Sequence, residues 1–273
     1  MNVKFIIAFA LISSLIGCKA KIKIPAGDVT TIQPQEFSPA NIAGLQLWFK
    51  ADALPAIADN TPIAIWPDSS ANHLDAAQIN ANARPTYKSA ILNGKAVVHF
   101  NGTQYMATPG TANILSGHGT LIAVYTSSSP YSVSFVAGFP HSATNATWQA
   151  PWVGFEIGTS TNQGRFWLNI TGTDREFSAG TLPSNTFHTQ SLNFDGTTRN
   201  GYINGVSVYS DATANGAITY EGSPPFMLGM RSAISIGEFL NGDIAEVLYY
   251  SSALSLSDLQ KVENYLKTKY AHY

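Results

Sequence analysis

Two carboxylates stand two residues apart at Asp174 and Glu176, a spacing that could support acid chemistry. Residues i and i+2 of a β-strand point to the same face, so this pair could act as nucleophile and acid on a glycosidic bond, which needs carboxyl groups about 5–5.5 Å apart. Arg175 lies between them, and a solvated turn with a surface ion pair is the alternative interpretation. The spacing alone leaves both interpretations open.

A second acidic pair, Asp243 and Glu246, stands three residues apart on an expected strand. An odd separation places two side chains on opposite faces of a regular strand. We therefore expect these two carboxylates to lie apart and to satisfy loop and backbone donors.

Oxygen-bearing side chains that could hold calcium occur at Asp68, Asn72 and Asp75. Calcium prefers carboxylate and carbonyl oxygens, and short acidic loops often supply them. The alternative is that Asp68 and Asn72 close Asx turns by accepting hydrogen bonds from the backbone. Calcium is the only cofactor that the sequence suggests, since the six histidines lack the spacing of a zinc site.

Aromatic and amide residues gather in the segment 141–152, which has no strand or helix period. Trp148 and Trp152 have no periodic reason to be buried there, and rings of this kind stack on the apolar faces of sugars. Asn145 and Gln149 could bind sugar hydroxyl groups. We predict that these four residues contact a ligand, although most aromatic residues of the surrounding region should fill a core.

Composition places these residues in a folded, β-rich protein. Only 12% of the residues are charged and the net charge is −2, which argues against nucleic acid as a partner. Asn204-Gly205 between alternating residues predicts a hairpin, and a helical period from Leu259 to Tyr270 predicts one closing helix that begins near Ser255. The runs expected to be strands are Leu45–Phe49, Ala96–Phe100, Thr120–Thr126, Val133–Phe139, Val153–Ile157, Phe166–Ile170, His188–Phe194, Gly201–Tyr209, Phe226–Gly229 and Ile244–Tyr250.

The N-terminus carries a short apolar leader that ends at the only cysteine, in Leu15-Ile16-Gly17-Cys18. The leader is too short to span a bilayer and is typical of a signal peptide, here residues 1–17. Its end resembles the bacterial lipobox, which implies a lipid on Cys18 and a membrane anchor. A plain secretory signal is the alternative. Residues 18–40 are expected to be a tether, and Lys19 favours the outer membrane of a bacterial cell envelope.

Four segments in the first half resemble the laminin-G-like jelly rolls of the concanavalin A-like superfamily, as does the run Gly242–Tyr250 before the helix. The four segments are Gly44–Asp52, Trp66–Ser70, Arg84–Tyr87 and Asn93–Gly102. The resemblance implies an all-β fold over residues 41–273: a two-sheet antiparallel jelly-roll sandwich with one C-terminal α-helix. Related lyases use a His and Tyr pair with an Arg, and His188, Tyr202 and Arg165 supply those residue types.

The expected function is that of a lipid-anchored surface lectin-like module that binds glycan or another extracellular partner without catalysis. A glycan-active hydrolase or lyase with a diverged site is the first alternative. A structural envelope protein that packs against other proteins is the second.

Overall fold

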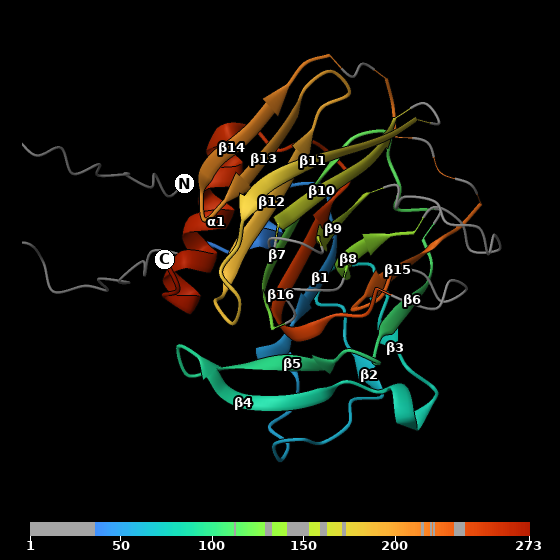
Figure 1. The fold of residues 1–273 in the computed structure, drawn as a ribbon, viewed down its shortest axis with the longest axis vertical. Coiled ribbons are helices and arrows are strands. Elements are labelled where there is room, and N and C mark those ends of the chain that lie inside the picture. Colours follow the sequence, from blue (N-terminus) through green and yellow to red (C-terminus); the bar gives the residue numbers. More distant parts are fainter. Residues whose placement is uncertain are drawn as a thin grey trace, which may run out of the picture. The chain divides into compact units, whose positions relative to one another are not determined.

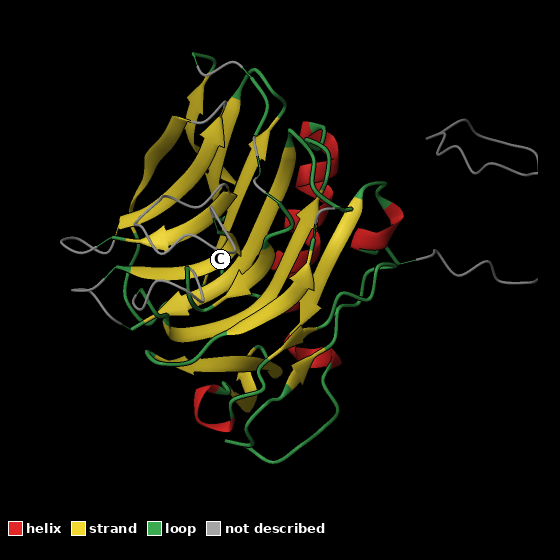
Figure 2. Ribbon diagram, turned by 90° about the vertical axis from the view of Figure 1, so that its right-hand side faces the viewer, coloured by secondary structure: helices red, strands yellow, loops and turns green. Residues whose placement is uncertain are grey.

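The computed structural model describes residues 36–111, 113–128, 133–140, 153–158, 163–170, 173–213, 216–218, 220, 222–231 and 238–273. Residues Phe37–Tyr273 form one compact unit. Within it, two antiparallel sheets of eight strands each lie face to face, and a single α-helix, α1 (Leu256–Tyr270), covers the outer side of one sheet (Figures 1 and 2). The predicted all-β sandwich with one C-terminal helix is confirmed.

The first sheet has the strand order β14-β13-β12-β7-β16-β5-β4, and β1 also pairs with β16. Its strands are β1 (Leu45–Lys50), β4 (Thr86–Leu92), β5 (Lys95–Asn101), β7 (Gly119–Ser127), β12 (His188–Phe194), β13 (Arg199–Ile203), β14 (Val206–Asp211) and β16 (Asn241–Tyr250). One edge of β16 pairs with β5 along its first half and with β1 along its second half. Segments from both ends of the compact unit therefore meet at β16.

The second sheet has the order β11-β10-β9-β8-β15-β6-β3-β2. Its strands are β2 (Ile65–Trp66), β3 (Ala76–Ala77), β6 (Met106–Gly110), β8 (Ser134–Phe139), β9 (Val153–Ile157), β10 (Gln163–Ile170), β11 (Thr173–Thr181) and β15 (Pro225–Leu228). Three short 3-10 turns, Pro39–Asn41, Ala51–Ala53 and Ala81–Ala83, complete the described secondary structure.

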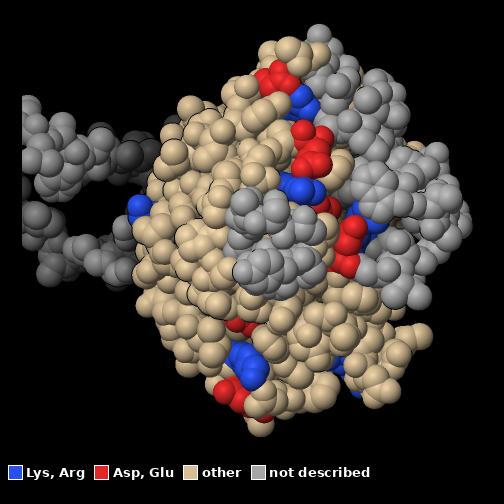
Figure 3. All heavy atoms as spheres, viewed as in Figure 1, with Lys and Arg blue, Asp and Glu red and all other residues tan. Residues whose placement is uncertain are grey.

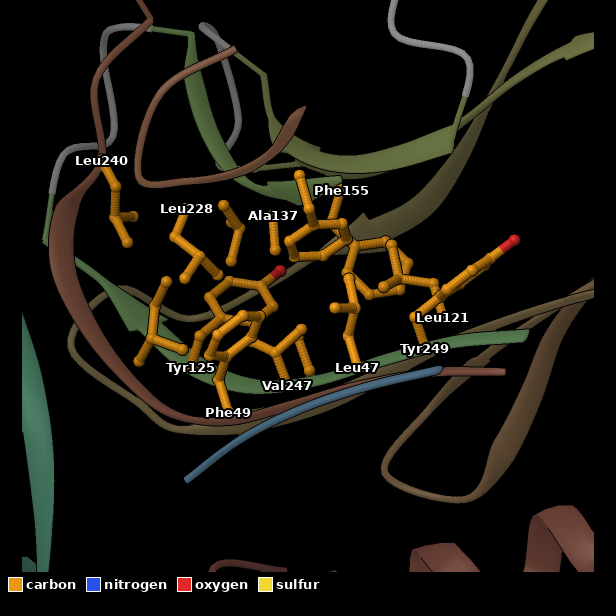
Figure 4. Close-up of a cluster of buried hydrophobic side chains, with 14 of the residues drawn as sticks. Leu47, Phe49, Leu121, Tyr125, Ala137, Phe155, Leu228, Leu240, Val247 and Tyr249 are labelled. Carbon is orange, nitrogen blue, oxygen red and sulfur yellow. The ribbon is translucent and has the colours of Figure 1, made fainter. Parts of the chain in front are cut away.

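The main core fills the space between the two sheets, where alternate residues of facing strands meet (Figure 4). Phe139 of the second sheet packs edge-to-face on Tyr249 of the first, with ring centroids 4.9 Å apart. A second apolar cluster joins the first sheet to α1 through Val97, Leu248 and Leu259. The helix thus covers the part of the outer face of the first sheet that carries this cluster.

The predicted hairpin and helix start are both confirmed. Asn204 and Gly205 join β13 to β14 with φ of 52° and 76°, the positive values that a two-residue hairpin turn requires. Ser255 caps α1 by accepting a hydrogen bond from the backbone N–H of Asp258 at 3.1 Å. None of the helices among the described residues is long and apolar enough to cross a membrane.

The expectation that Asp243 and Glu246 point to opposite faces is wrong. The pairing of β16 with β7 shifts between Ile244 and Glu246, and this bulge adds one residue to the strand. An extra residue reverses the alternation, so both carboxylates lie on the helix side of the first sheet. Asp243 pairs there with His99 at 2.7 Å, and Glu246 pairs with Lys269 of α1 at 2.7 Å.

Glu246 anchors the helix on the sheet. Its side chain is fully buried and accepts hydrogen bonds from Trp48 Nε1 at 2.5 Å and from the Tyr270 hydroxyl at 2.8 Å. Lys269 adds an ion pair to Glu246 and a second one to Asp52 at 2.8 Å. The buried charge is compensated on all sides, as burial of an ionised carboxylate requires.

Candidate functional site

Three charged side chains stand in a row on neighbouring strands of the second sheet. Phe155, Phe166 and Phe177 point into the main core from β9, β10 and β11. Because side chains alternate along a strand, Glu156, Arg165 and Glu176 point the other way, to what we call the outer face of the second sheet. Figure 3 shows acidic and basic side chains beside one another on the side of the molecule that carries these strands in Figure 1.

Arg165 bridges the two carboxylates. Its Nη1 lies 3.0 Å from Glu156 Oε1, and its Nε lies 3.0 Å from Glu176 Oε1. Gly158 makes room for this arrangement, because a Cβ there would lie 2.5 Å from the guanidinium. The side chain of Glu156 is only 3% exposed, whereas that of Glu176 is 38% exposed. The buried partner is therefore Glu156, and the accessible one is Glu176.

A second ion pair, Arg231 with Glu238, lies beside Glu156. The Nε of Arg231 is 2.8 Å from Glu238 Oε2, and the Glu238 carbonyl accepts a hydrogen bond from the Phe135 N–H at 2.8 Å. Phe135 is the cross-strand partner of Glu156, so this bond places Glu238 next to the row. We call these five residues, Glu156, Arg165, Glu176, Arg231 and Glu238, the outer-face charge cluster.

The pKa of Glu156 is raised from 4.5 to about 7. The main cause is burial, which penalises the ionised carboxylate, and the negative charge of Glu238 adds to it. The charges of Arg165 and Arg231 act in the opposite direction without cancelling the effect. Near neutral pH, Glu156 can therefore either donate or accept a proton.

An apolar area borders the charge cluster on the same sheet. Phe135, Met227 and Met230 form a buried group, against which Tyr105 and Phe239 pack. Trp167 of β10 is 5% exposed on the same face, and its Nε1 has no hydrogen-bond partner among the described residues. Charged donors and acceptors thus share one sheet face with aromatic groups.

This arrangement suits recognition of a polar ligand with apolar faces. Arginine and carboxylates bind hydroxyl or carboxylate groups in fixed geometry, and aromatic rings cover C–H surfaces. A carboxylate with a pKa near neutrality is also the kind of group that enzymes use as a general acid. A buried carboxylate with a raised pKa beside an arginine on a sheet face is a candidate functional site.

The structure brings only part of the sequence-predicted set to this face. Glu176 belongs to the charge cluster. Asp174 lies two residues earlier on the same strand, where its backbone pairs with that of Asn169. The predicted ligand contacts and the lipidation site lie outside the described residues; these are Asn145, Trp148, Gln149, Trp152 and Cys18.

The three residue types of a lyase do not come together. His188 lies on β12 against the core residue Tyr125, with ring centroids 6.3 Å apart. Tyr202 packs on the helix side of the first sheet, and Arg165 lies on the outer face of the second. Tyr202 and Arg165 therefore lie on the outer faces of different sheets, and His188 lies in the core between them.

Among the residues considered for calcium, the carboxylates of Asp68 and Asp75 accept hydrogen bonds from nearby protein groups. Oδ1 of Asp68 accepts hydrogen bonds from the N–H groups of Trp48 and Ser70, and Oδ2 accepts from the Ser70 hydroxyl and the Leu74 N–H, all between 2.7 and 3.0 Å. Asp75 accepts a bond from the Asp68 N–H at 2.9 Å. Four donors occupy the lone pairs of one carboxylate, so this donor set does not fit a calcium site in the conformation described.

Glu156, Arg231 and Glu238 were not among the residues predicted from the sequence, and Arg165 was considered only together with His188 and Tyr202. In the run Val153–Ile157, the apolar residues Val153, Phe155 and Ile157 alternate with Gly154 and Glu156. That period was a usable signal for Glu156. Arg231 and Glu238 flank a segment without a period, and no sequence signal points to them.

A profile of the concanavalin A-like lectin/glucanases superfamily matches residues 100–260 of the chain. No curated protein sequence matches it. Among solved structures, domain 4 of the extracellular arabinanase AbnA from Geobacillus stearothermophilus, in complex with arabinotriose, is 14% identical with a TM-score of 0.58; the match covers 80% of this chain and 98% of that domain.

A sialidase from Trypanosoma rangeli in complex with sialic acid is 15% identical with a TM-score of 0.56. That match covers 84% of this chain but 34% of the sialidase, so the chain spans about one third of that protein. The binding domain of Paraclostridial Mosquitocidal Protein 1 is 10% identical with a TM-score of 0.55, over 84% of this chain and 53% of that one. At these identities the likeness is one of fold.

Proposed function

Since the chain belongs to the concanavalin A-like lectin/glucanases superfamily, we propose that it is a carbohydrate-binding protein whose glycan lies on the outer face of the second sheet. The observation that carries the proposal is the position of Arg165 between Glu156 and Glu176, at 3.0 Å from each. A sugar hydroxyl or carboxylate can bind to the guanidinium and to the exposed Glu176 together. The arabinotriose complex of a domain with the same fold supports this class of ligand.

The proposed role is binding without turnover, at the surface of a bacterial cell. The leader and Cys18 support a lipid anchor, which we place in the outer membrane. Labelling cells with a clickable fatty acid tests the anchor. We expect the protein to be labelled and Cys18→Ala to abolish the label, whereas unchanged labelling would exclude Cys18 as the site.

Hydrolysis is the second candidate, because Glu156 has the raised pKa of a general acid and Glu176 is a nearby carboxylate. Release of reducing ends from a bound polysaccharide, lost in Glu156→Gln, would support it. Binding of the same polysaccharide without product, in the wild type and the variant alike, would favour the non-catalytic role.

A glycan array with the wild-type protein tests the main proposal. We expect at least one glycan to bind and Arg165→Ala to remove the signal, while Arg165→Lys keeps the charge but weakens binding because the planar fork is lost. Lys261→Ala, which removes an exposed positive charge on α1, is the control and should bind normally. Equal binding by Arg165→Ala and the control would refute the site, and the absence of any bound glycan would count against carbohydrate binding.

A further inference from the structure

A separate polar pocket lies between the tip of the β13–β14 hairpin and α1, away from the outer face of the second sheet. Its volume is about 280 Å³. Drug-sized ligands occupy pockets of roughly 300–1,000 Å³, so this pocket suits a smaller molecule. Gly205 at the hairpin tip lines it and contributes no side chain, which leaves the pocket open at that point.

The carboxylate of Glu263 is the central group of the pocket. The residue is 4% exposed, and its Oε1 accepts a hydrogen bond from the Ser191 hydroxyl at 2.7 Å. The other oxygen, Oε2, faces Gly205, where a Cβ would lie 3.5 Å away. Among the described residues, no hydrogen bond reaches Oε2. A carboxylate oxygen that lines a pocket without a donor of its own can accept a hydrogen bond from a ligand.

The remaining lining groups define the ligand chemistry. Lys267 offsets the charge of Glu263, so the pocket is close to neutral. The side-chain oxygen Oδ1 of Asn204 accepts a hydrogen bond from the Thr189 N–H at 2.9 Å, which leaves the side-chain NH₂ to donate to a ligand. The ring of Tyr273, with Lys267 Nζ 5.0 Å from its centroid, adds an apolar surface.

We propose that this pocket binds a neutral, multiply hydroxylated molecule of the size of one sugar residue. One ligand hydroxyl donates to Glu263 Oε2, and others accept from Lys267 and from the Asn204 amide. The pocket is a second site, independent of the glycan site on the second sheet. Either can exist without the other.

Amide chemical-shift mapping with glucose, galactose, mannose, N-acetylglucosamine and myo-inositol tests the proposal. We expect at least one of them to shift residues 204–206 and 260–267 in a saturable way, with a Kd on the order of 1–10 mM. Asn264→Trp places a large ring at an exposed lining position of α1 and should abolish these shifts. Thr268→Trp, at an exposed helix position outside the pocket, is the matched control and should preserve them.

Glu263→Gln keeps the side-chain size and removes the charge, so we expect it to weaken binding about tenfold. Arg165→Ala should leave the pocket shifts intact, which separates this site from the glycan site. The proposal is overturned if none of the five compounds produces saturable shifts at the pocket, or if Asn264→Trp leaves such shifts unchanged.

Discussion

Replacement of Glu156 by glutamine should change the pH dependence of stability in a specific direction. Folding raises the pKa of this carboxyl from 4.5 to about 7. The native state therefore binds the proton more tightly than the unfolded state does. Between pH 4.5 and 7 the native state holds more protons, so the contribution of Glu156 to the free energy of unfolding falls as the pH rises. Below pH 4.5 the penalty is absent, and above pH 7 it is fully present.

The size of the effect follows from the shift. One pKa unit corresponds to about 1.4 kcal/mol, so the change from 4.5 to about 7 corresponds to about 3 kcal/mol. Glu156→Gln has nearly the same shape and cannot ionise. The difference in the free energy of unfolding, variant minus wild type, should therefore increase by about 3 kcal/mol from pH 4 to pH 8. The contact with Arg165 affects the absolute value of this difference, but the slope reports ionisation.

Urea denaturation at several pH values, followed by tryptophan fluorescence, measures this difference. In thermal unfolding it corresponds to a relative change in Tm of about 6–12 °C for a domain of this size. Glu176→Gln, which removes the exposed carboxylate of the same cluster, is measured alongside as the control. A Glu156→Gln difference that stays constant from pH 4 to pH 8, or that decreases, would refute the reasoning.

Three further outcomes can be checked. Glu246→Ala should destabilise the protein by about 3–5 kcal/mol, measured by urea denaturation, because it leaves Lys269 beside a buried site without its main partner. Asp68→Ala should lower Tm to the same extent with calcium and with chelator, because it removes an acceptor of four hydrogen bonds; a loss seen only with calcium would indicate a metal site. Any anionic glycan that binds should bind more tightly at pH 6 than at pH 8 in a titration, because protonation of Glu156 removes a negative charge beside Arg165. Glu156→Gln should remove that dependence on pH.

Much of the fold could be predicted because local signals and the tertiary structure agree. The Asn204-Gly205 turn needs positive φ at both positions, and few other residues tolerate it. The helix could be placed from its period and from Ser255, which caps it as expected. The bulge in β16 could not be predicted, because it arises from pairing with strands far away in the sequence. That bulge turned Glu246 toward the helix.

The candidate site was less accessible to sequence reasoning. Glu176 was identified from its spacing to Asp174, but its important neighbour, Arg165, lies on the next strand. Glu156 comes from a third strand, and its raised pKa depends on burial and on Glu238. Such a cluster is defined by strand order, which the spacing of residues along one chain does not reveal. The alternative of Asx turns is confirmed for Asp68, which accepts from the Ser70 N–H, whereas the side chain of Asn72 donates to Gln46 instead.

The most direct test of the proposed function is a map of amide chemical-shift changes when the best glycan from the array is added. We predict that the largest changes fall on residues 154–157, 164–167 and 176–178, the parts of β9, β10 and β11 that carry the charge cluster, and that Arg165→Ala abolishes them. Changes confined to other parts of the protein, or changes that persist in Arg165→Ala, would contradict the placement of the glycan on the outer face of the second sheet.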